Sequence, residues 1–124
     1  MLRDIHGPVA ISDLTVVEMR CLLARLRREG SIDANMEIRV FATFEEDIRQ
    51  KFLTCYPFPD GLAAGAVNLV SVLSDIPLRT LDVLHLMVAR EIQAAILATA
   101  DRIMADGAQA SGISVVRFDR PGAR

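Results

Sequence analysis

Apolar and polar positions in the first half of the chain switch between strand-like and helix-like patterns. Val9 to Leu14 is a short apolar run suited to a buried strand, and Thr15 to Glu29 repeats apolar side chains at helical spacing. Gly30 is expected to end that helix, because glycine commonly follows the last helical turn. A second amphipathic segment continues to about Lys51. The first half therefore predicts one strand followed by two helices.

The second half continues the alternation. Strands are expected at Phe52 to Phe58, Ala95 to Thr99 and Ile113 to Phe118, and helices at Leu62 to Leu73, Thr80 to about Gln93 and Asp101 to Ala105. Strands that alternate with helices imply right-handed crossover connections and a mostly parallel sheet. We therefore expect an α/β fold.

Size and charge narrow the class of protein. With 124 residues, of which 52% are hydrophobic, the chain can bury one core and is expected to form a single domain over residues 1–124. A formal net charge of -2 argues against a broad basic surface that would hold nucleic acid mainly through its phosphates.

Cellular location is indicated by the cysteines and by the hydropathy pattern. Cys21 and Cys55 are isolated thiols without metal-site spacing, as is typical of proteins in a reducing compartment. No segment has the length and apolar character of a signal peptide or a membrane span. The sequence predicts a soluble, cytoplasmic protein.

Three carboxylates each stand where an apolar run gives way to a helix: Glu18, Asp82 and Asp101. Strand ends and helix starts share one edge of an open α/β sheet, where ligands bind. Each acid also has a structural explanation, since Thr15 with Glu18 reads as a capping box and the other two suit helix starts. Together, however, three clustered carboxylates would repel one another without a cation or altered protonation, and oxygen ligands suit Mg²⁺ or Mn²⁺.

Three segments resemble successive blocks of the PIN-domain nucleases, in particular the VapC-type toxins of toxin-antitoxin pairs. They are AISDLTVVEMR, PLRTLDVLHLMVA and ILATADRIMADGAQASGISVV, and the likeness runs from about Val9 to Val116. The resemblance implies a three-layer α/β/α fold with a mostly parallel sheet. It also implies a metal-dependent endoribonuclease, in which acids hold Mg²⁺ or Mn²⁺ and the metal activates water to attack an RNA phosphodiester.

The resemblance assigns roles to individual residues. By position, Glu18, Asp82 and Asp101 match the second, third and fourth metal-binding and catalytic acids of the family. Thr99 matches the hydroxyl residue that often precedes the last acid. Five basic residues could guide RNA phosphates. Three of them lie on the first helix, where solvated surface is the expectation for most: Arg20, Arg27 and Arg28. Arg79 and Arg102 are the better candidates, because they are sequence neighbours of Asp82 and Asp101.

The start of the chain departs from the family pattern. The family begins with a central strand of the type apolar-apolar-D-[ST]-[AS], which supplies the first aspartate, whereas only eight residues precede Val9 here. Asp4 does not fit that pattern, and Asp13 is expected to start a helix. We therefore expect an N-terminally truncated PIN-like domain. Its Val9 strand would pair with the Ala95 strand, or a second chain would fill the gap.

Partners follow from the resemblance alone. They are an RNA substrate, a small antitoxin protein whose segment lies across the acidic edge, and a second copy of the chain in a homodimer, with no membrane. Two alternatives to the nuclease remain open at this point. One is a catalytically impaired PIN-like interaction module, and the other is a truncated fragment without nuclease activity.

Overall fold

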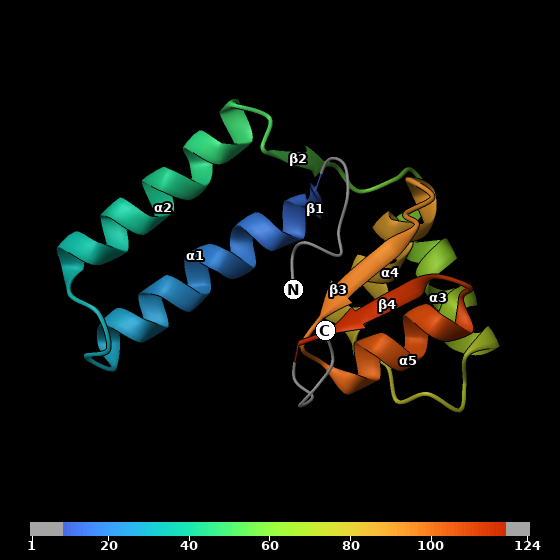
Figure 1. Cartoon of the computed structure of the whole chain (residues 1–124). Helices are drawn as coiled ribbons and strands as arrows, with labels where there is room; N and C mark the ends of the chain where they lie inside the picture. Colours follow the sequence, from blue (N-terminus) through green and yellow to red (C-terminus); the bar gives the residue numbers. More distant parts are fainter. Residues whose placement is uncertain (1–8, 119–124) are drawn as a thin grey trace. The chain divides into compact units, whose positions relative to one another are not determined.

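Short strands alternate with helices along the chain (Figure 1). A computed structural model describes residues 9–118, which include neither Asp4 nor the C-terminal tail from Arg120. The elements are β1 (Val9–Ser12), α1 (Asp13–Arg28), α2 (Ala34–Arg49), β2 (Leu53–Tyr56), α3 (Leu62–Val72), α4 (Thr80–Glu91), β3 (Ile96–Thr99), α5 (Arg102–Ala110) and β4 (Ser114–Arg117). This order confirms the α/β class. The described chain divides into two compact units, 9–57 and 58–118, and the single domain stays a prediction.

Strand pairing is parallel in both units. β1 pairs with β2, with Val9 opposite Leu53, and β3 pairs with β4, with Ile96 opposite Ser114. The structure gives β1 its parallel partner in β2, within one unit, whereas the expected pairing of the Val9 strand with the Ala95 strand would join the two units and stays a prediction. The backbone groups of β1 find their partners along β2, which the chain reaches after two intervening helices.

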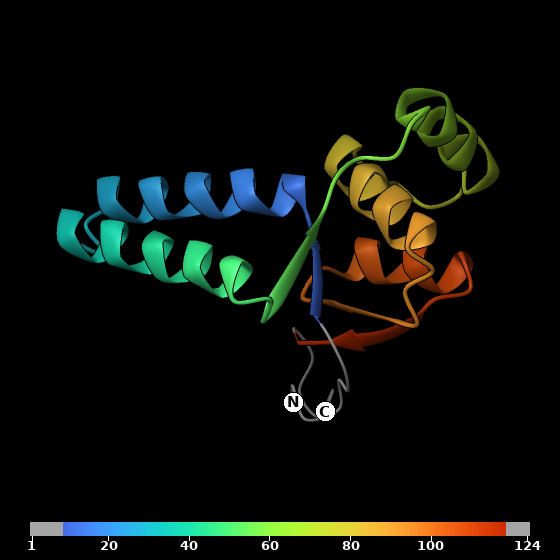
Figure 2. The same ribbon diagram turned by 90° about the horizontal axis from the view of Figure 1, so that it is seen from above.

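The unit of residues 9–57 is a helical hairpin with a small parallel sheet at its base. Figures 1 and 2 show α1 and α2 lying side by side and running in opposite directions. Gly30 allows the turn between them because its φ of 81° is in the left-handed region, which glycine adopts without steric cost. Leu23 of α1 and Phe44 of α2 are the buried apolar side chains of this unit among the described residues.

An ion-pair cluster also joins the two helices of the hairpin. Glu37 of α2 is buried, and its carboxylate accepts from Arg20 at 2.9 Å and pairs with Nε of Arg27 at 2.7 Å. The Arg20 guanidinium also lies over the Phe41 ring, 5.6 Å from its centre. Arg20 and Arg27 therefore join the two helices, whereas the sequence favoured solvated surface for most of the basic residues on the first helix.

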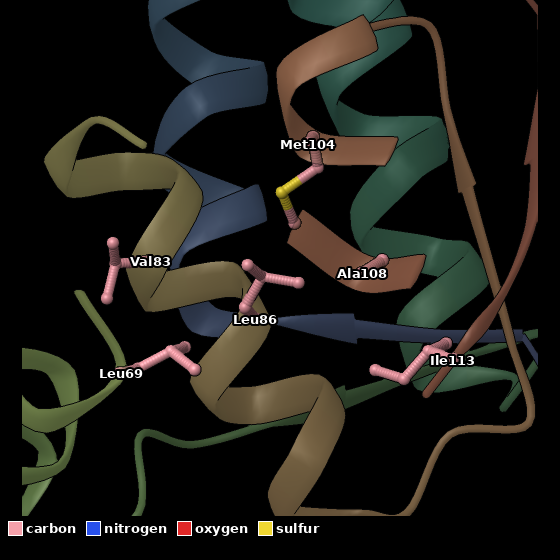
Figure 3. Close-up of a cluster of buried hydrophobic side chains, with 6 residues drawn as sticks. All are labelled: Leu69, Val83, Leu86, Met104, Ala108 and Ile113. Carbon is pink, nitrogen blue, oxygen red and sulfur yellow. The ribbon is translucent and has the colours of Figure 1, made fainter. Parts of the chain in front are cut away.

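The unit of residues 58–118 contains the larger apolar core. Six buried side chains from the helices α3, α4 and α5 and the approach to β4 gather in one cluster (Figure 3): Leu69, Val83, Leu86, Met104, Ala108 and Ile113. Leu97 of β3 and Val115 of β4 face one another in the sheet register and pack against this cluster. The sheet therefore turns one face towards the helices.

Packing explains why α5 extends beyond its predicted end at Ala105. Ala108, one turn later, is fully buried in the core, so the helix continues to Ala110. Gly107 belongs to the same buried face, where an added Cβ would lie 2.9 Å from methyl groups of Leu78 and Leu86. A side chain at position 107 would collide with the core, which accounts for a glycine inside a helix.

The lengths and hydropathy of the helices can be compared with those of a membrane span. Within residues 9–118, none is long and apolar enough to cross a bilayer.

Candidate metal centre

Asp82 lies at the start of α4, where the sequence placed it. It is the third residue of the helix, and its Oδ2 accepts a hydrogen bond of 2.9 Å from the backbone N–H of Arg79, the residue that precedes the helix. A carboxylate in the first turn is stabilised by the unpaired N–H groups and by the helix dipole. The Asp82 side chain is buried, so this hydrogen bond fixes its direction.

Asp101 lies at the start of α5, directly after β3. It is the N-cap, and its Oδ1 accepts from the backbone N–H of Ile103 at 3.0 Å. Thr99 supports this turn from the strand side, since its Oγ1 accepts a 3.1 Å hydrogen bond from the backbone N–H of Asp101. The predicted hydroxyl residue therefore positions the backbone of the acid that follows it.

The guanidinium of Arg79 lies close to the carboxylates of both aspartates. Its Nε lies 3.7 Å from Asp82 Oδ2, and one of its terminal nitrogens lies 3.5 Å from Asp101 Oδ2. The sequence marked Arg79 for RNA phosphates and did not foresee this contact with the acids. The spacing Arg79-x-x-Asp82 at a helix start was an available signal, because side chains three positions apart meet on a helix. The contact with Asp101 spans 22 positions and has no such signal.

The chemistry of this pair suits a hard divalent cation. Asp82 and Asp101 present carboxylate oxygens to a common positive group, and Mg²⁺ is often held by one or two carboxylates while it keeps several waters. The two acids therefore fit such an ion. Across residues 9–118, no group of three or more His, Cys, Asp or Glu side chains is arranged to hold a metal.

Glu18 lies in the other unit, in the second turn of α1, and is partly buried. Its expected capping box with Thr15 is wrong. The helix starts at Asp13, one turn earlier than the box required, so Ser12 is the N-cap and forms the capping box with Thr15. Asp13 is the first residue of α1, which confirms its expected role as a helix-start residue.

Two further basic candidates occupy solvent-facing positions. Arg102 is exposed at the first position of α5, next to Asp101, and Arg28 is exposed in the last turn of α1. Their suggested contact with RNA stays a prediction.

Comparison with known proteins agrees with the resemblance at the level of the family. The chain matches the family model described as the PIN domain over residues 1–120, a longer stretch than Val9 to Val116. No curated protein and no solved structure matches it.

Proposed function

Because the chain belongs to the PIN-domain family, we propose that it is a metal-dependent endoribonuclease of the VapC toxin type. The family is nuclease-like, and its members generally use divalent metal ions. One observation carries the proposal for this chain. The side chains of Asp82 and Asp101, from the starts of two different helices, meet on a single guanidinium group. Such a pair of oxygen ligands suits Mg²⁺ or Mn²⁺.

The metal would be held by Asp82 and Asp101, and Glu18 is proposed as a further ligand from the family pattern alone. When bound, Mg²⁺ or Mn²⁺ lowers the pKa of its water and neutralises charge on the phosphate. The chain itself fixes where the carboxylates stand. Asp82 is held by the backbone of Arg79, and Asp101 is held by the backbone of Ile103. Little side-chain freedom is lost when these ligands bind a cation.

Other residues of the same region would serve the substrate. Thr99 holds the turn that presents Asp101. Arg102 is exposed beside that acid and can pair with an RNA phosphate, as can Arg79 once its side chain turns away from the aspartates.

Partners are proposed from the type of family member. A small antitoxin would cover the acidic edge in the cytoplasm, and two copies of the chain would form a homodimer by strand-edge pairing. Within residues 9–118 each sheet has two strands, so each strand has one edge beyond its parallel partner. A monomer mass by light scattering at the working concentration would count against the homodimer.

A second candidate function is a PIN-like interaction module with impaired catalysis. It is favoured by the small number of ligands, since the described residues offer an aspartate pair but no cluster of three. This module would bind a protein partner without cleaving RNA.

Substitution of the paired acids separates the two functions. Asp82→Asn and Asp101→Asn should each lower Mn²⁺-dependent cleavage of an unstructured RNA at least about 100-fold, because each removes a charged metal ligand. Asp106→Asn is the matched control, as Asp106 is exposed on α5. If the wild type binds Mn²⁺ and cleaves no RNA, the interaction module is the better description. Full activity in Asp101→Asn contradicts the proposed centre.

A further inference from the structure

The Arg79 guanidinium lies close to both carboxylates of the candidate centre. It is within 4 Å of each, at 3.7 Å from Asp82 and 3.5 Å from Asp101. Two carboxylates that lie near one group repel each other unless a positive charge offsets the repulsion. In this unit, Arg79 of the chain itself provides that positive charge.

The two oxygens of Asp101 are engaged differently. Oδ1 accepts the N–H of Ile103 and caps α5, whereas Oδ2 faces the Arg79 side chain. Oδ2 is the oxygen of Asp101 that the helix cap does not use, and it is the oxygen that Arg79 contacts, so a divalent ion that binds Oδ2 meets the guanidinium there. The guanidinium and the metal therefore compete for one ligand atom.

The aspartates do not depend on the guanidinium for their positions. Backbone N–H groups hold both carboxylates, and Asp82 is also buried. The Arg79 side chain is 74% exposed, and its two ion pairs are long. Exposed ion pairs of this kind contribute little to stability, so the guanidinium can turn to solvent at small cost. Its remaining effect on a divalent ion is charge repulsion.

We infer that Arg79 is the resident counter-ion of the Asp82–Asp101 pair, and that a divalent metal binds by displacing its guanidinium. This inference rests on the proposed metal function. It makes Arg79 a positioning residue that sets how much free metal the centre needs. Before a divalent ion binds, the guanidinium offsets one of the two negative charges, and binding of the ion releases the guanidinium next to the place where RNA would bind.

Direct measurement of Mn²⁺ affinity tests the competition. By electron paramagnetic resonance of free Mn²⁺, Arg79→Gln should bind about tenfold more tightly than wild type, since the positive charge that competes for the two carboxylates is removed. Arg79→Lys should stay within about twofold of wild type, because it keeps the charge. Arg90→Gln is the matched control, as Arg90 is exposed in the last turn of the same helix. Unchanged or weaker binding in Arg79→Gln overturns the inference.

A metal-free double-mutant cycle keeps this result separate from the nuclease proposal. In urea with chelator present, Arg79→Gln should destabilise the wild type slightly and should have a smaller effect in an Asp101→Asn background, where only the pair with Asp82 remains to be lost. Equal effects in both backgrounds overturn the counter-ion role whatever the metal does. If the cycle and the Mn²⁺ shift are found but no RNA is cleaved, the nuclease proposal fails and the counter-ion stands. If neither wild type nor Arg79→Gln binds Mn²⁺, the competition fails.

Discussion

At the residue scale, capping and metal binding are not exclusive roles for one carboxylate. Asp101 uses Oδ1 for the N–H of Ile103 and turns Oδ2 towards Arg79. The sequence presented helix capping as the alternative to metal binding. Because a carboxylate has two oxygens, the same side chain can close a helix end and still offer a ligand.

Cys55 gives a prediction about thiol reactivity. Burial, and secondly the hydrogen bond that its Sγ donates to Asp13 at 3.1 Å, raise the pKa of this thiol from 9.0 to about 11. At about pH 8, a pKa that is higher by about two units lowers the fraction of thiolate, the reactive form, roughly 100-fold. Iodoacetamide should therefore label Cys55 far more slowly than the exposed Cys21, as mass spectrometry can follow in single Cys→Ser variants. Equal rates would contradict this assignment.

At the scale of elements, the hairpin of α1 and α2 shows the limit of reading a helix by itself. Both helices are found close to their predicted ranges, because their apolar spacing and end signals are local. The partner of Arg20, however, is Glu37, which lies 17 positions away. Ion pairs between two helices depend on which faces the helices turn towards one another. The sequence of either helix alone does not predict that orientation.

The hairpin should therefore loosen in acid through Glu37. The hydrogen bond from Arg20 is the main cause that holds the pKa of this carboxyl below its ordinary value of 4.5. A carboxyl whose pKa is lower in the folded state than in the unfolded state stabilises the fold. This stabilisation is complete at pH values above the pKa of the unfolded state, and it is lost as the pH falls through the pKa of the folded state. Between about pH 6 and about pH 3, the wild type should lose more stability than Glu37→Gln in urea unfolding.

The control for this titration is Glu45→Gln, since Glu45 is exposed on the same helix. This variant should keep the acid sensitivity of the wild type. Identical pH profiles for Glu37→Gln and wild type would show that the ion pairs do not contribute to the stability of the hairpin.

At the scale of the whole molecule, the apolar core is divided unequally between the two units. Among the described residues, Leu23 and Phe44 are the buried apolar side chains of residues 9–57, whereas eight others belong to residues 58–118. Apolar burial is the main source of folding free energy. The helical hairpin is therefore expected to be the less stable unit.

Hydrogen exchange can compare the units directly. Backbone amides of α1 and α2 should exchange at least about tenfold faster than those of α4 and α5, because local opening costs less where fewer apolar side chains are buried. The exchange should be measured at a protein concentration at which light scattering gives the mass of the monomer, so that self-association does not protect the amides of the hairpin. Equal protection of the two helix pairs would contradict the uneven core.

The sequence by itself determined the order of elements, the α/β class and the helix-start positions of Asp82 and Asp101, because periodicity and capping act over a few residues. Residue patterns also carried the resemblance to the family, which the match over residues 1–120 confirms. The capping box of α1 was misplaced by one turn because the strand was expected to continue to Leu14, whereas it ends at Ser12.

Only the tertiary structure decided which elements pair and which charges meet. The partner of β1 proved to be β2, and the length of α5 followed from burial of Ala108. The three carboxylates were expected to need an external cation, yet Arg79 already lies between two of them. Contacts between residues far apart in the chain depend on the packing of helices and strands, and local propensity does not contain that information.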